Sequence, residues 1–176
     1  SAHVRSLGHL LRALVMFGLG EPREVVLAAR RAVSEDPRSS EALLGLVYMG
    51  RAGIQLRDVE VVSGAIDSLL RTSPRGGWMG ACIGELRAGA LALSGDTTGA
   101  AMGFVEAADH YRTMGLPPEV AFATIEALEL VGDALGDREA MIAEAAAIID
   151  QLRFETLRPR LDAIRARTPE GIPAAG

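Results

Sequence analysis

Apolar residues recur at intervals of three and four along most of the chain, which is the spacing of one face of an α-helix. The first expected helix, over 3–18, carries Val4, Leu7, Leu10, Leu11, Leu14 and Val15. Further helices are expected at 22–35, 39–56, 58–72, 78–93, 97–114, 118–135, 138–154 and 156–167. No segment shows the strict alternation of a strand, so the pattern predicts an all-α chain.

The turns between these helices follow a recurring phrase, a glycine followed by an acidic residue and then a helix rich in small residues. It occurs at 20–21, 95–96 and 136–137, with separations of 75 and 41 residues. A period near 37 to 38 is typical of stacked helical hairpins, which bury their apolar faces against one another. The sequence therefore predicts a right-handed α-α superhelix of about four hairpins plus a C-terminal capping helix.

The extent of the helical pattern sets the expected domain limits. Residues 1–167 are predicted to form one repeat domain. Residues 72–77 form a turn cluster of Thr, Ser, Pro, Arg and Gly. Residues 168–176, composed mainly of Pro, Gly and Ala, lack periodicity and are expected to form a disordered tail.

The third hairpin carries a family resemblance. Gly95, Asp96, Ala100, Phe104 and Ala107 are spaced as in the second helix of a tetratricopeptide repeat, and the chain resembles that family over most of 3–154. The resemblance implies that the alanines admit neighbouring helices and that the phenylalanine fills the hairpin. The period departs from the standard 34 residues of the family.

Further features resemble longer-period helical arrays in large bacterial regulators. Arg112, Gly115 and Pro117 close the third hairpin, whereas Arg57 occupies the glycine position of the second. Similar arrays occur in ATPase-containing transcription activators of the LuxR/MalT kind and in class III nucleotide cyclases with ATPase and repeat regions. The resemblance implies a non-catalytic interaction or effector-sensing scaffold within a multidomain, cytoplasmic bacterial signalling or transcriptional regulator.

Composition narrows the chemistry further. All eighteen basic residues are arginine, so a P-loop lysine and a Schiff-base lysine are excluded. The net charge of −5 argues against direct nucleic-acid binding, and no apolar run approaches the roughly 20 residues of a membrane span. A single cysteine, Cys82, excludes an internal disulfide and a CxxC motif. We therefore expect neither a metal nor a cofactor.

The expected binding surface is the concave face lined by the first helix of each hairpin. On the family's register, Arg51, Gln55, Glu85, Glu126 and Asp133 could project into this groove. They would contact a protein or peptide segment, or neighbouring domains of the same chain. The alternative is that these five side chains are simply exposed to solvent.

Two further interpretations remain open from the sequence. The first is a helical enzyme or small-ligand sensor with a pocket near Cys82, Glu85 and Glu126; in the competing interpretation Cys82 is a buried packing residue. The second concerns the N-terminal helix. Its apolar residues Leu7, Leu10, Leu14 and Phe17 would suit another repeat stacking ahead of it, or a homodimer formed through the N-terminal hairpin.

Overall fold

A computed structural model describes residues 1–72 and 76–167, in which helices joined by turns and short loops are the only regular secondary structure and no strand occurs. The elements are α1 (Ala2–Gly18), α2 (Pro22–Glu35), α3 (Ser40–Leu56), α4 (Val59–Thr72), α5 (Gly77–Leu93), α6 (Thr97–Thr113), α7 (Pro117–Val131), the short 3-10 helix η1 (Gly132–Ala134), α8 (Arg138–Leu152) and α9 (Arg158–Ala166). The predicted all-α class is confirmed. The predicted tail at 168–176 and the centre of the turn cluster at 72–77 lie outside the described residues.

Five of the described helices begin at a capping side chain. Ser1, Ser39, Asp96 and Asp137 each accept a hydrogen bond from the backbone N–H three residues later. Asp58 accepts two such bonds at the start of α4. Each cap satisfies a donor that the first turn of a helix otherwise leaves unpaired.

The turns explain two of the three recurring glycines and one position where a glycine is missing; Gly136 does not have a positive φ. Gly20 and Gly95 have φ angles of 74° and 93°, in the left-handed region that glycine adopts without a Cβ penalty. Arg57 ends α3 with a φ of 55°, so an arginine takes the conformation that glycine has elsewhere. The turn geometry of the repeat is thus retained where the glycine is missing.

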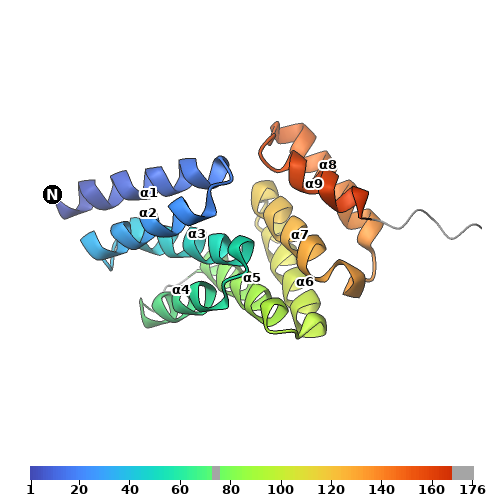
Figure 1. The fold of residues 1–176 in the computed structure, drawn as a ribbon, viewed down its shortest axis with the longest axis horizontal. Helices are drawn as coiled ribbons and strands as arrows, with labels where there is room; N and C mark the ends of the chain where they lie inside the picture. The colour runs from blue at the N-terminus through green and yellow to red at the C-terminus, as the bar shows by residue number, and fades with distance from the viewer. Residues whose placement is uncertain (73–75, 168–176) are drawn as a thin grey trace, which may run out of the picture.

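The helices pack as successive antiparallel hairpins in a curved array. Each helix contacts the next in sequence, and α1 also contacts α3, α3 contacts α5, α5 contacts α7, and α7 contacts α9. The odd-numbered helices therefore form an inner row. The array curves, so that the upper end of α7 lies near the C-terminal end of α1 (Figure 1). This arrangement is consistent with a superhelical stack of hairpins.

Close helix approach depends on small residues in the inner row. A Cβ added to Gly50 of α3 would lie 2.6 Å from the side chain of Leu86 in α5. A Cβ on Gly89 of α5 would overlap Ile54 of α3. Gly45 of α3 lies against Ala29 and Ala32 of α2. The scarcity of aromatic residues is therefore compensated by tight packing of glycine and alanine.

Candidate functional site

Three of the five predicted groove residues are buried in the protein interior. Arg51, Glu85 and Glu126 each have an exposed fraction of 0%. The expectation that these side chains project into an open groove is therefore wrong, as is the alternative that they are exposed to solvent. Gln55 is half-buried, and Asp133 is exposed at a separate hollow described below.

Arg51 is the centre of a buried ion cluster that joins three helices of the inner row. Its Nε and Nη2 donate to the two carboxylate oxygens of Glu85, both at 2.8 Å. Nη2 also donates to Glu119, in the first turn of α7, where the helix dipole favours a negative charge. The fork of Arg51 therefore ties α3 to α5 and α7, and bidentate pairing of this kind is among the stronger hydrogen-bonded contacts.

Glu119 was not among the predicted site residues, although a signal for it exists. Arg51 and Glu85 are separated by 34 residues, and Arg51 and Glu119 by 68. This is the standard repeat length, which differs from the spacing of the turn glycines. A search for charged residues at 34-residue intervals would have placed Glu85 and Glu119 in line with Arg51.

Tyr111 and Cys82 extend the cluster towards α6. The Tyr111 hydroxyl donates to Glu85 Oε2 at 2.6 Å, and its oxygen lies 3.3 Å from Cys82 Sγ. Burial and the nearby Glu85 carboxylate raise the pKa of Tyr111. Burial also raises the pKa of the Cys82 thiol to about 12. Because the thiolate is the reactive form, the side chain is a poor nucleophile at neutral pH.

Burial and the neighbouring carboxylates act in opposite directions on the pKa of Arg51. Burial lowers the pKa of its guanidinium, but the adjacent Glu85 and Glu119 carboxylates outweigh burial and raise that pKa overall. The guanidinium also lies over the rings of Tyr48 and Phe122, at 5.7 and 5.3 Å from their centroids. These cation–π contacts further stabilise the charged guanidinium.

Aromatic side chains close the inner face beside this cluster. Phe17 of α1 contacts Tyr48 of α3 and Phe122 of α7, with ring centroids 5.0 and 5.2 Å apart. Phe122 also contacts Phe154, which follows α8, at 5.5 Å. The first and fourth hairpins therefore meet through their side chains, and the concave face is filled at this point.

Glu126 is buried on α7, and neither of its carboxylate oxygens has a hydrogen-bond partner among the residues that the structure describes. Burial is the main cause of its raised pKa, and the nearby Glu85 carboxylate acts in the same direction. Arg160 and Arg51 act in the opposite direction but do not reverse the shift. Arg160 itself donates two hydrogen bonds to Glu129, at 2.9 and 2.7 Å, one helical turn from Glu126. The arginine is thus engaged by the neighbouring glutamate.

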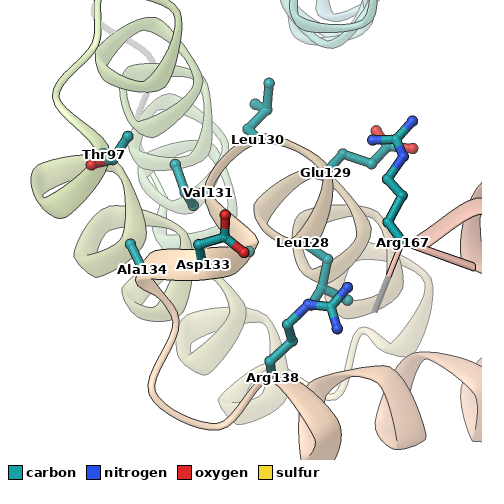
Figure 2. Close-up of a pocket in the computed structure, with 10 residues that line it drawn as sticks. Thr97, Leu128, Glu129, Leu130, Val131, Asp133, Ala134, Arg138 and Arg167 are labelled. Carbon is teal, nitrogen blue, oxygen red and sulfur yellow. The ribbon is translucent and has the colours of Figure 1, made fainter. Parts of the chain in front are cut away.

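Asp133 lines a hollow of about 480 Å³ at the end of α7, apart from the ion cluster. Figure 2 shows Asp133 on one side of this hollow and Glu129 with Arg167 on the opposite side. Arg138 also lines it and donates to the backbone carbonyl of Ile164. The structure therefore does not bring Asp133 together with the other predicted site residues.

The outer face of α1 exposes large apolar side chains. Val4, Leu7, Leu11 and Val15, which we call the α1 stripe, have exposed fractions of 63, 39, 53 and 56%. They recur at intervals of three and four, on the side of α1 away from the core. The sequence analysis also placed Leu10 and Phe17 on a free apolar face of this helix. That prediction is wrong for these two residues, because both are buried in the core.

No group of three or more His, Cys, Asp or Glu side chains that could hold a metal ion occurs in the described part of the chain. Across residues 1–72 and 76–167, every helix is too short or too polar to cross a bilayer.

Comparisons with protein-family models, curated proteins and solved structures found no match. The tetratricopeptide resemblance therefore stays a prediction.

Proposed function

We propose that this chain is a non-catalytic helical-repeat module that binds a protein segment or a neighbouring domain within a multidomain bacterial signalling or transcriptional regulator. The observation that carries the proposal is the α1 stripe. Four large apolar side chains on one helix face form a continuous surface, and exposed apolar surfaces of this kind mark interaction sites in proteins. The curved stack of hairpins would hold this surface rigid.

The state of the buried groups favours this proposal over a helical enzyme or small-ligand sensor. Glu85 accepts hydrogen bonds from Arg51 and Tyr111, and the Cys82 thiol is kept protonated by burial. Together with the bond from Arg51 to Glu119, these contacts join α3, α5, α6 and α7. These side chains thus have a structural role in holding the hairpins together, and the second interpretation would require them to become accessible.

Site-specific photocrosslinking tests the proposal in cells that make the full-length protein. A benzophenone amino acid would replace Leu11 in the α1 stripe, and Met102 on α6 in a matched control. Met102 is also an exposed apolar residue, with an exposed fraction of 71%. We expect a discrete crosslinked product from position 11 that mass spectrometry maps to one protein segment, and that Val15→Glu removes. Equal or weaker crosslinking at position 11 than at position 102 would overturn the proposal.

A further inference from the structure

We infer that the α1 stripe binds an amphipathic α-helix whose apolar face is flanked by acidic residues. The inference rests on the proposed function and names the chemistry of its partner. Two independent observations lead to it: the equivalent face of α3 is buried against a helix, and the N-terminal hairpin carries a net positive charge.

The first observation is an internal equivalence between α1 and α3. Ser1 and Ser39 are the caps of the two helices, so positions at equal distance from them correspond. By this register Val4, Leu7 and Leu11 correspond to three residues of α3 that are all buried, namely Ala42, Gly45 and Met49. At this face Gly45 lies against Ala29 and Ala32 of α2.

The same face therefore forms the contact between successive hairpins within the array. In α3 it is covered by a helix, and in α1 it is exposed among the described residues. The α1 stripe is in this sense a continuation of an interface that the protein already uses. A helix is the occupant whose shape matches this face, because ridges of side chains spaced three and four apart pack into the grooves of another helix.

The second observation is the charge of the N-terminal hairpin. Residues 1–38 contain six arginines and four acidic residues, a net charge of +2, while the other twelve arginines and nineteen acidic residues give the rest of the chain −7. The stripe thus lies on a basic segment of an acidic protein. Helix α1 itself contains no acidic residue.

Some of this basic charge is exposed on α2, the helix that packs against α1. Ion pairs of 2.8 Å from Arg5 and 2.9 Å from Arg12 attach α1 to glutamates of α2. On α2, Arg23, Leu27 and Arg31 share an exposed face at intervals of four residues. Neither of these two arginines makes an ion pair with any carboxylate in the described part of the chain. A partner with acidic residues beside its apolar face would complement the positive charge of this exposed face of α2.

A second copy and a lipid surface fit less well. Two copies joined through α1 would bring together two N-terminal hairpins that each carry a net charge of +2, and like charges at an interface disfavour association. An anionic membrane would satisfy the charge but not the equivalence with α3, where the same face packs against a helix. Both occupants are outcomes that the experiment below can detect.

Two synthetic helical peptides with the same leucine face test the inference. One carries glutamate along both edges of that face and the other carries arginine. Binding to the purified chain would be measured by fluorescence anisotropy at low and at physiological salt. We expect the acidic peptide to bind at least about tenfold tighter than the basic one, with a smaller difference at higher salt because ions screen exposed charges.

Three variants locate the binding. Leu11→Glu should abolish it, Arg31→Glu should remove most of the preference for the acidic peptide, and Met102→Glu on α6 should leave it unchanged. Circular dichroism would show that each variant is folded, which is expected because all three side chains are exposed. Absence of binding, equal binding of the two peptides, or binding that survives Leu11→Glu would each overturn the inference.

Two more measurements separate the competing occupants. Light scattering that shows a concentration-dependent dimer, lost in Leu11→Glu, would assign the stripe to a second copy. Binding to phosphatidylglycerol vesicles through Leu11, without peptide binding, would assign it to a lipid surface and overturn the proposed function as well. If crosslinking at position 11 succeeds in cells but both peptides fail, only the inferred partner chemistry is wrong.

Discussion

Replacing Glu126 with methionine should stabilise the protein, because this carboxyl group is buried and unpaired within residues 1–72 and 76–167. Neither of its oxygens has a hydrogen bond to a described residue, and its exposed fraction is 0%. Burying an unpaired polar group costs about 1–3 kcal/mol in protein mutational data. Methionine has a similar length and adapts its shape to the space available. We therefore expect Glu126→Met to increase the free energy of unfolding by about 1–3 kcal/mol near pH 5.

The gain should increase with pH, and its direction follows from the raised pKa of Glu126. In the unfolded chain the carboxyl group loses its proton near its ordinary value of 4.5, whereas in the folded protein burial and Glu85 keep it protonated to higher pH. Above 4.5 the unfolded state thus binds fewer protons, and this group makes the wild-type protein progressively less stable until the folded pKa is passed. Arg51 on α3, Arg160 on α9 and Glu129 on α7 are the other charged groups that act on it.

Urea unfolding at pH 5 and pH 8, analysed by linear extrapolation, measures both effects. Glu126→Gln is the companion variant, because it keeps a polar group but cannot ionise; it should gain stability over the wild type at pH 8 more than at pH 5. A gain of 1 kcal/mol corresponds to about 2–4 °C in Tm for a chain of this size. Glu129→Met, one turn away, is the control and should be neutral or destabilising since it breaks the pair with Arg160.

The opposite results would refute the reasoning. If Glu126→Met lowered the free energy of unfolding by more than about 1 kcal/mol, the carboxyl group would have to be paired in the folded protein. If the difference between Glu126→Met and wild type were the same at both pH values, Glu126 would not be held protonated by its surroundings.

Further predictions concern the cluster, the packing and the turns. Arg51→Met should lower the free energy of unfolding by about 3–5 kcal/mol, since it leaves buried carboxylates uncompensated; a loss under 1 kcal/mol in urea unfolding would contradict this. Gly89→Ala should cost about 1–3 kcal/mol by overpacking against α3, whereas Gly84→Ala, with open space at its Cβ, should gain about 0.5–1 kcal/mol; equal thermal shifts would disprove the packing argument. Arg57→Gly should increase the free energy of unfolding by about 0.5–1 kcal/mol and so raise Tm, because glycine adopts the left-handed conformation of residue 57 without strain; a lower Tm would count against it. Cys82 should resist a thiol reagent in native buffer and react on unfolding, and complete reaction within minutes in the native state would show an accessible pocket.

Most of the helices could be predicted from the sequence alone. Apolar spacing and capping residues act within a few residues along the chain, so the expected helices agree closely with those of the structure. Pro159 lies in the first turn of α9, where a helix tolerates proline. The largest difference is at the end of the seventh helix, where the expected helix to 135 stops at Val131 and continues as the 3-10 helix η1.

The candidate site could be predicted only in part. Sequence reasoning selected Arg51, Glu85 and Glu126 as polar residues on the inner helices, and they do lie there, but it did not predict their burial. The polar character of a side chain does not reveal whether a partner of opposite charge will meet it in the interior. That depends on how the helices cross: Arg51 lies in the C-terminal half of α3, Glu85 near the middle of α5 and Glu119 in the first turn of α7.

The sequence by itself determined the helices and their turns, because periodicity, caps and glycine conformations are local properties of the chain. Only the tertiary structure decided which faces are covered, because burial depends on contacts between residues far apart in sequence. Phe17 and Leu11 illustrate the difference: both are apolar residues of α1, yet one packs against Phe122 in the fourth hairpin and the other is exposed. The α1 stripe is therefore a property of the assembled fold.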